Sequence, residues 1–188
     1  MKGRVIILAL LALMCCINTG LAHKKSYYTK SRPYVHKQKQ VTNLHFYYHE
    51  TSNVENATTV IVAKPAANDP SPSQFGTITA MDDPLTIGPD PSSEVIGKAQ
   101  GMYVFAGQDR TMLVMYADFG FLKGKFNGSS ISVMSRNSVL DRERDLAVVG
   151  GTGKFRMAKG LAMLKTYSGL KPHVGTHVEY KIKLVHYN

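Results

Sequence analysis

The sequence predicts an all-β fold, built as a single antiparallel barrel or sandwich. Three observations support this prediction. Short segments rich in β-branched and aromatic residues recur along the chain. Clusters of Pro, Gly, Asp and Asn separate these segments, and no apolar stripe with helical spacing is sustained between them. The 188 residues are enough for one domain with a packed core.

Eight or nine strands are expected, each indicated by its composition. The segment 177–187 shows the pattern most clearly, because apolar and polar side chains alternate along it with a period of two. Turn clusters are expected at 68–74, 82–93 and 170–175. In chain order, the expected strands are 41–50, 58–64, 75–83, 98–107, 111–124, 128–136, 146–151, 155–168 and 177–187.

Residues 1–22 have the organisation of a secretory signal peptide. Two basic residues precede an apolar run of about a dozen residues, which is short for a membrane span, and small residues follow up to Ala22. We therefore expect a secreted, extracellular protein with no membrane segment after the signal is removed. Both cysteines, Cys15 and Cys16, lie inside this segment, so the mature domain is expected to contain no disulfide.

The formal net charge of +10 is concentrated near the N-terminus. Residues 23–40 contain six Lys or Arg and no acidic residue, whereas basic and acidic residues nearly balance from Val41 onward. We expect a disordered basic arm over 23–40 and a folded domain over 41–188, which gives no indication of nucleic-acid binding. The arm either binds anionic cell-wall polysaccharide or is a solvated tail without a partner. Behind a signal peptide, the sequons at Asn56 and Asn127 predict surface glycosylation.

The glycine cluster at 150–153 raises the question of a phosphate-binding loop. Such a loop leaves a strand and opens a helix, whose N-terminus faces the anion. Here a strand-like segment follows the cluster, and no Gly-Lys-Ser/Thr signature is present. We interpret the glycines as a tight reversal between two strands that requires positive φ.

Six motifs together resemble plant dirigent proteins. They are LHFYYHE, DDPLTIGP, GKAQGMYVF, GKFNGSSISVMSRN, VVGGTGKFRMAKGLAMLKTY and EYKIKLVHY, in the order of the family, and the resemblance covers nearly all of 41–188. It implies an eight-stranded antiparallel β-barrel, similar to that of allene oxide cyclases, often assembled as a homotrimer in the apoplast.

The resemblance implies that the protein directs the coupling of phenoxy radicals in phenylpropanoid (lignan-type) synthesis. A separate laccase-type oxidase supplies the radicals, and the barrel itself needs no cofactor. Holding two radicals so that one pair of faces meets is enough to select a product. Two alternatives stay open. One is dehydration and ring closure through a quinone methide, as in pterocarpan synthases, and the other is plain binding of a hydrophobic metabolite.

The resemblance also indicates the site residues. Glu50 takes the place of the commoner Asp in the family's His-Asp pair, and we expect it to act as an acid at the barrel mouth. Arg144 stands at the position of a cavity arginine, although its neighbours alone would predict a solvated charge cluster. His49 is the other half of the pair, but alternation places it on the opposite strand face.

Three further residues match substrate-contacting positions of the family. Tyr103 matches an aromatic that meets the substrate ring, and Thr166 aligns with a pocket position. Asn137 stands where pinoresinol-forming members carry an aspartate, and an amide cannot supply a proton, so this residue argues against pinoresinol formation.

Other catalytic or metal-binding patterns are either interpreted as structural or absent from the sequence. Asp82 and Asp83 would suit acid–base chemistry, but they precede Pro84 and are expected to cap a turn. The seven histidines show no metal-ligand spacing, and no metal site is expected. No nucleophile elbow with a Ser-His-Asp order is present, and the mature chain has no cysteine for thiol chemistry.

Overall fold

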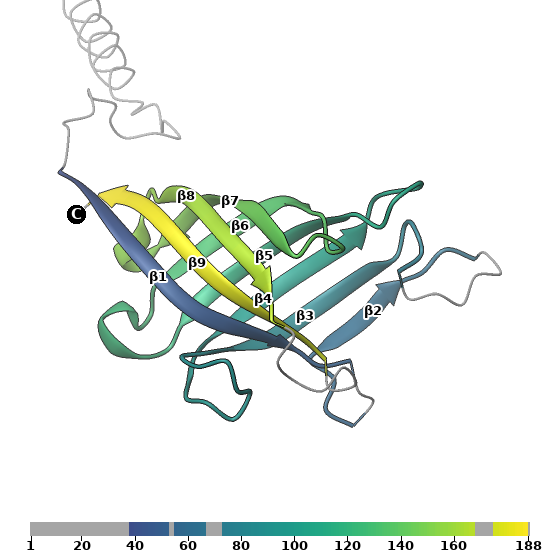
Figure 1. Cartoon of the computed structure of the whole chain (residues 1–188). Helices are drawn as coiled ribbons and strands as arrows, with labels where there is room; N and C mark the ends of the chain where they lie inside the picture. The colour runs from purple at the N-terminus through teal and green to yellow at the C-terminus, as the bar shows by residue number, and fades with distance from the viewer. Residues whose placement is uncertain (1–37, 53–54, 67–72, 168–174, 188) are drawn as a thin grey trace, which may run out of the picture. The chain divides into compact units, whose positions relative to one another are not determined.

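The computed structural model describes residues 38–52, 55–66, 73–167 and 175–187 (Figure 1). The expected signal peptide and most of the expected arm lie outside the described residues. The described chain forms nine strands and two short 3-10 helices. They are β1 (Lys39–Glu50), β2 (Thr59–Ala63), β3 (Ile78–Thr86), β4 (Val95–Phe105), β5 (Leu113–Phe121), η1 (Gly124–Phe126), β6 (Ser130–Asn137), β7 (Glu143–Thr152), η2 (Gly153–Phe155), β8 (Lys159–Thr166) and β9 (Thr176–Tyr187).

Eight of these strands form a closed antiparallel barrel. Its neighbours run in the order β1, β9, β8, β7, β6, β5, β4, β3, and a short pairing of β1 with β3 completes the circle. The β1–β9 pairing is the most extensive, and the two strands lie side by side in Figure 1. The prediction of an eight-stranded antiparallel barrel is confirmed, whereas the homotrimer stays a prediction. β1 begins at Lys39, two residues before the expected start of the domain.

Strand β2 continues the path of β1 along the same edge of β3. Tyr48 pairs with Leu85 of β3, and Thr59 at the start of β2 pairs with Met81, so the segment between β1 and β2 is an insertion in one long pairing. The backbone N–H of Thr58 donates to Thr51 O at 2.8 Å and closes the insertion at its base. The barrel wall is therefore interrupted opposite residues 82–84.

The prediction of a turn at Asp82-Asp83-Pro84 is wrong, because all three residues lie inside β3. The N–H of Asp82 donates toward the insertion, to Thr58 O, at 2.9 Å. The nitrogen of Pro84, two residues on, faces the same side of the strand, where the ladder is already interrupted. Proline has no N–H to donate, and at this position β3 loses no ladder bond by containing it.

The barrel interior follows from the two-residue period of the strands. Inward positions are mostly apolar and buried. Aromatic side chains fill the centre: the rings of Phe46 and Tyr180 stack with their centroids 5.6 Å apart, and the ring of Phe119 lies edge-on to both. Hydrophobic burial on this scale is the main stabilising term for a domain in which the described residues contain no disulfide. Among the described residues, no helix is long and apolar enough to cross a membrane.

The glycine cluster at 150–153 is a strand reversal, as predicted. Gly150 and Gly151 lie in β7, and Gly153 opens η2 with a φ of 59° before β8 begins at Lys159. The same tripeptide, Gly-Lys-Phe, forms η1 between β5 and β6, where Gly124 has a φ of 65°. No phosphate-binding helix follows the cluster, and the strand expected from residue 155 starts four residues later.

We expect Gly153→Ala to destabilise the barrel more than Gly124→Ala does. Each alanine would occupy a left-handed conformation, at about 1–2 kcal/mol. At Gly153 an added Cβ would also lie 2.6 Å from Ser129 Oγ and 3.0 Å from its Cα, whereas at Gly124 nothing lies within 4 Å. Urea denaturation of both variants measures the difference. Equal losses in the two variants would contradict the close approach to Ser129.

Candidate active site

A cavity of about 330 Å³ opens at one end of the barrel. The C-terminal ends of β1, β4, β6 and β8 meet the starts of β5, β7 and β9 there, so side chains from seven strands converge. Its wall is mostly apolar, with Phe105, Leu113, Met115 and Val178, and Tyr180 joins it to the central aromatic group. Five of the six predicted catalytic or substrate-binding residues line this cavity: Glu50, Tyr103, Asn137, Arg144 and Thr166.

Glu50 is the carboxyl group of the cavity. It is the last residue of β1, and its half-buried side chain accepts a hydrogen bond from the Tyr103 hydroxyl at 3.3 Å and from the Tyr48 hydroxyl at 3.1 Å. Burial raises the pKa of Glu50, and the two tyrosine hydrogen bonds oppose this rise without cancelling it. A carboxyl group with a raised pKa beside an apolar cavity is suited to act as a general acid.

Asp83 is a second carboxyl group, which sequence reasoning assigned to a turn. Its side chain is fully buried; Oδ2 lies 2.7 Å from the Tyr48 hydroxyl, and Oδ1 accepts a hydrogen bond from Thr58. Burial raises the pKa of Asp83 to about 7, against the effect of both hydrogen bonds. Asp82 points to the outer face and forms an ion pair with Lys98 at 2.7 Å. The two neighbouring carboxyls therefore do not act as a pair.

Arg144 lies across the cavity, at the start of β7. Its Nη1 donates to Asp141 O at 2.6 Å and to Thr166 Oγ1 at 2.9 Å, which fixes the guanidinium group. Its Nε–H is buried and has no hydrogen-bond partner among the described residues. Burial lowers the pKa of Arg144, but a guanidinium group stays charged. The site thus holds a cation whose Nη1 is fixed by two hydrogen bonds.

Asn137 adds an acceptor to the cavity. The side chain is 7% exposed and its Nδ2 donates weakly to Met115 Sδ at 3.4 Å. Its Oδ1 is buried without a partner within the described part of the chain. Together with Glu50 and Arg144, this arrangement offers one acid, one charged donor and one acceptor around an apolar hollow, which fits a phenolic ligand with several oxygens.

His49 lies on the other face of β1, outside the cavity, as its alternation with Glu50 predicts. Its Nδ1 lies 2.8 Å from His177 Nδ1, and its Nε2 lies 2.6 Å from Thr86 Oγ1. Thr86 donates to Gly88 O at 2.7 Å, so His49 Nε2–H is the donor to Thr86 and His49 Nδ1 accepts from His177. His49 does not line the cavity, and its substrate-binding role stays a prediction. Within the described ranges, no three metal-ligating side chains come together.

The buried His49 predicts a loss of stability in acid. Burial and the neighbouring His177 lower the pKa of His49 to about 4, from 6.5 in an exposed chain. Between these values the unfolded chain binds a proton that the folded chain does not, so the free energy of unfolding falls as the pH falls from 6.5 to about 4. The raised pKa of Asp83 acts in the opposite direction.

His49→Gln isolates the histidine contribution, since an amide can replace both hydrogen bonds without titrating. We expect urea denaturation at about pH 7 and about pH 5 to show a smaller acid-induced loss for the variant than for the parent protein. An equal loss in both proteins would contradict the assignment of the acid sensitivity to His49.

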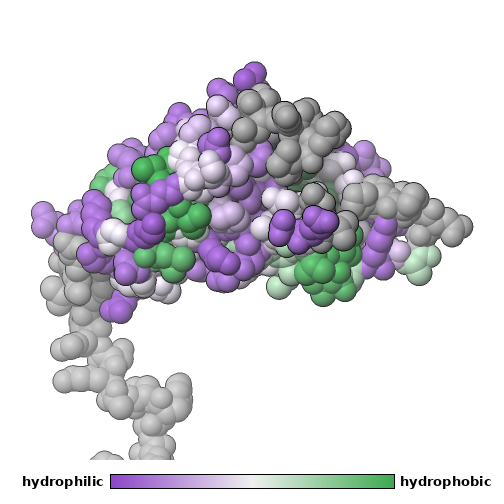
Figure 2. Space-filling view, turned by 90° about the horizontal axis from the view of Figure 1, so that it is seen from below, coloured by the Kyte–Doolittle hydropathy of each residue, from purple (hydrophilic) through white to green (hydrophobic). Residues whose placement is uncertain are grey.

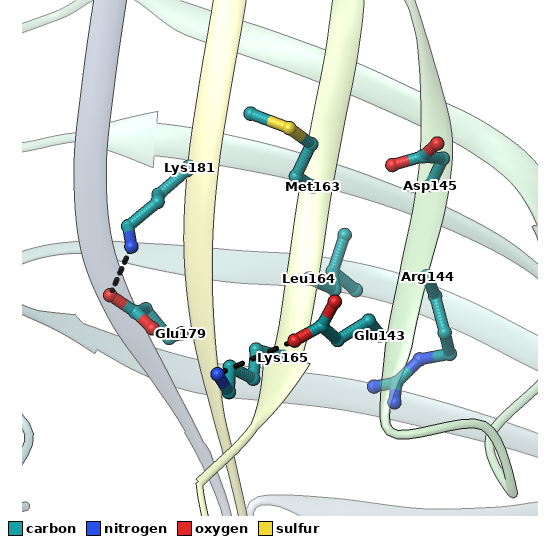
Figure 3. Close-up of a pocket in the computed structure, with 8 residues that line it drawn as sticks. All are labelled: Glu143, Arg144, Asp145, Met163, Leu164, Lys165, Glu179 and Lys181. Carbon is teal, nitrogen blue, oxygen red and sulfur yellow. Dashed lines mark ion pairs between the residues drawn. The ribbon is translucent and has the colours of Figure 1, made fainter.

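A second hollow, of about 410 Å³, lies on the outer face of β7, β8 and β9 (Figure 3). Lys181 reaches Glu179 at 3.1 Å and Lys165 reaches Glu143 at 3.4 Å, and Met163 lies beside them. The lysines and Glu143 are largely exposed, so these ion pairs are weak and water-screened. Although this hollow is larger than the barrel cavity, none of the carboxyl groups that line it is buried.

Comparison with known proteins gives the same family as the motifs. The family model described as "Dirigent-like protein" matches residues 41–185. Dirigent protein 15 of Arabidopsis thaliana is 44% identical over 172 residues, which span 88% of this chain and 89% of the relative. Pterocarpan synthase 1 of Glycyrrhiza echinata is 41% identical over 165 residues, spanning 86% of this chain and 88% of the relative.

A solved structure agrees with these sequence comparisons. The pterocarpan synthase dirigent protein GePTS1 superposes with a TM-score of 0.78 at 40% sequence identity, covering 86% of this chain and 100% of that one. The residues matched by the family model, 41–185, include both Glu50 and Arg144. On the family model, the relatives and the shared barrel, the chain belongs to the dirigent family.

Proposed function

We propose that the protein binds one phenolic metabolite in the barrel cavity and catalyses its dehydration and ring closure through a quinone methide. The observation that carries this proposal is Glu50, a carboxyl group with a raised pKa that faces an apolar cavity opposite the fixed cation Arg144. An acid and a phenolate-binding donor are the two groups that such a reaction needs. The relatives named pterocarpan synthase support the same reaction class.

The reaction balances without an oxidant. The substrate phenol ionises, and Arg144 donates a hydrogen bond to the phenolate oxygen. Glu50 gives its proton to the benzylic hydroxyl as the C–O bond breaks, so water leaves and a quinone methide forms. A second hydroxyl of the substrate adds to the methide carbon and returns its proton to Glu50. The phenolate takes up a proton from solvent, and the net change is the loss of one water.

Stereoselective coupling of phenoxy radicals is the second candidate function. The apolar cavity wall favours it, because coupling requires orientation and no redox centre, with radicals supplied by a laccase-type oxidase. Two observations place it second. A volume of about 330 Å³ is near the lower end of the range for ligand pockets, about 300–1,000 Å³, which suits one ligand better than two. In addition, a coupling product in which two rings close would use a second acid, and Asn137 cannot supply a proton.

One experiment separates the candidates. The protein is incubated with a hydroxyisoflavanol without oxidant, and separately with coniferyl alcohol with and without a laccase. Ring closure without oxidant supports the proposed dehydration. Enantiomeric excess from coniferyl alcohol, seen only with the oxidase, overturns it in favour of radical coupling. Ligand binding with neither product leaves a metabolite-binding protein and overturns both reactions.

We also propose that the protein is secreted to the apoplast and glycosylated at Asn56 and Asn127, both exposed in the fold. The same proposal includes removal of residues 1–22 as a signal peptide. It also includes binding of the basic arm at 23–40 to anionic wall polysaccharide. Mass spectrometry of the secreted protein, before and after enzymatic deglycosylation, tests the signal cleavage site and both sequons. Retention of the full and the arm-deleted protein on a pectin column tests the arm.

Assembly as a homotrimer is proposed from the outer surface of the barrel. Met102, Tyr116 and Met134 are register partners on β4, β5 and β6 and are 44–57% exposed, so they form one apolar row. Figure 2 shows hydrophobic residues gathered in separate groups on an otherwise hydrophilic face. Contiguous exposed apolar surface of this kind is typical of protein contacts. Sedimentation velocity measures the mass of the assembly, and a monomer at all concentrations would overturn the proposal.

A further inference from the structure

The Tyr48 hydroxyl lies between two carboxyl groups. It is 2.7 Å from Asp83 Oδ2 and 3.1 Å from Glu50 Oε2, so one oxygen atom joins a carboxyl that lines the cavity to one that does not. Tyr48 is 5% exposed and Asp83 is fully buried, so the contact between them is shielded from bulk water. The three groups come from β1 and β3, which meet only at the short pairing that closes the barrel.

Counting hydrogens fixes the protonation of this group. The phenol of Tyr48 has one hydrogen and can donate it to only one of the two carboxyls. If both carboxyls were ionised, the other contact would bring two oxygens together without a hydrogen between them. A hydrogen bond at each contact therefore requires one proton on the carboxyl pair. With that proton on Asp83, Tyr48 donates to Glu50; with the proton on Glu50, Tyr48 donates to Asp83.

The surroundings keep this proton in place. Among the described residues, neither carboxyl takes part in an ion pair. Burial raises the pKa of both carboxyls, and for Asp83 the neighbouring charges of Glu50 and Asp82 add to the rise. The titratable or charged groups that face the pair from the other packed strands are Tyr103 on β4, Arg144 on β7 and Tyr180 on β9.

We propose that Asp83 is a positioning residue that shares a single proton with Glu50 through the Tyr48 hydroxyl, so that Glu50 meets the substrate in its acid form. The proposal rests on the proposed function, in which Glu50 protonates the leaving hydroxyl. When the shared proton lies on Asp83, Asp83 can pass it to the Tyr48 oxygen as Tyr48 passes its own hydrogen to Glu50, which restores the acid form of Glu50. No bond to the substrate involves Asp83.

A purely structural role for Asp83 is the competing explanation. Asp83 Oδ1 accepts a hydrogen bond from Thr58, whose backbone closes the insertion between β1 and β2. In that case Asp83→Asn would loosen the insertion and lower activity equally at every pH. The shared proton predicts a different result, because removing one carboxyl of an interacting pair changes the pKa of the other.

The test compares Asp83→Asn with the parent protein, using Asp82→Asn as the matched control. The control removes the adjacent carboxyl, which is exposed and paired with Lys98 on the outer face. With the hydroxyisoflavanol assay, we expect Asp83→Asn to move the alkaline limb of the pH–kcat profile down by about one pH unit. At low pH, where Glu50 is protonated in both proteins, the rates should agree within about threefold. The control should move the limb far less, because the Asp82 charge is the smallest contribution to the raised pKa of Asp83.

A second measurement does not depend on activity. Carboxyl-labelled protein is titrated by NMR, and the midpoint of Glu50 is compared between the parent and Asp83→Asn. A fall of about one pH unit in the variant supports the shared proton even if no ring closure is detected, and then only the proposed function fails. The same Glu50 midpoint in both proteins overturns the proposal, as does a uniform loss of kcat with an unmoved limb.

Discussion

Glu50→Gln is expected to lower kcat for ring closure by about 10²–10⁴-fold while the barrel stays folded. The amide has nearly the shape of the acid and can keep both tyrosine contacts, but it has no proton to give to the leaving hydroxyl. KM should change little, because the substrate is held mainly by the apolar wall and by Arg144. Single-turnover kinetics with the hydroxyisoflavanol, alongside circular dichroism, measures both effects.

Two variants control this result. Glu50→Asp restores the acid one methylene further from the substrate and should recover part of the lost rate, which an inert carboxyl would not do. Glu143→Gln removes a largely exposed carboxyl of the outer hollow and should leave kcat unchanged. Full activity in Glu50→Gln would remove Glu50 from the chemistry and leave the cavity as a binding site.

The sequence contains most of the information on the strands. Each of the nine expected segments overlaps one observed strand, because period-two alternation follows directly from which face of the sheet is buried. The clearest error is at the end of β3, where a turn was expected from Asp82 but the strand continues past Asp83 to Thr86. Proline predicts a turn from local chemistry, but the interruption that lets β3 contain Pro84 is made by an insertion more than twenty residues earlier in the chain.

The residues of the candidate site are harder to predict from the sequence than the strands are. Glu50 and Arg144 were indicated by the resemblance, and the structure places both in one cavity. For Arg144 the local pattern alone predicts solvent, since Arg142, Glu143 and Asp145 are indeed exposed around it. Its burial depends on β8, which supplies Thr166 22 positions away.

Asp83 was missed for the same physical reason. Its partners Tyr48 and Thr58 lie 35 and 25 positions earlier in the chain, and they meet it only when the barrel closes. One signal was available: in a strand, alternation places Asp82 and Asp83 on opposite faces, so one of the two carboxyls must point inward. An inward carboxylate in an apolar barrel requires a partner or a proton.

The aromatic group beneath the cavity predicts the largest effect on stability. Phe46 is 1% exposed, its ring stacks on Tyr180 with an interplanar angle of 12°, and it contacts Phe119 and Phe121 edge-on at 5.7 and 6.0 Å. Each of these rings comes from a strand whose backbone is fixed in the barrel, so they cannot collapse into a space left by Phe46. Tyr180 also lines the cavity, and the packing of Phe46 therefore supports the substrate-binding surface.

Phe46→Ala is expected to lower the free energy of unfolding by about 3–5 kcal/mol, through the lost burial and the cavity left behind. Such a loss is a large part of the roughly 5–15 kcal/mol that stabilises a typical domain. Urea denaturation should give a lower midpoint with an unchanged slope. Phe75→Ala, at a ring that is 47% exposed, is the matched control and should change stability by at most about 0.5 kcal/mol. Equal losses in the two variants would mean that the centre of the barrel repacks freely, and the rigid floor under Tyr180 and Glu50 could not then hold a substrate for ring closure.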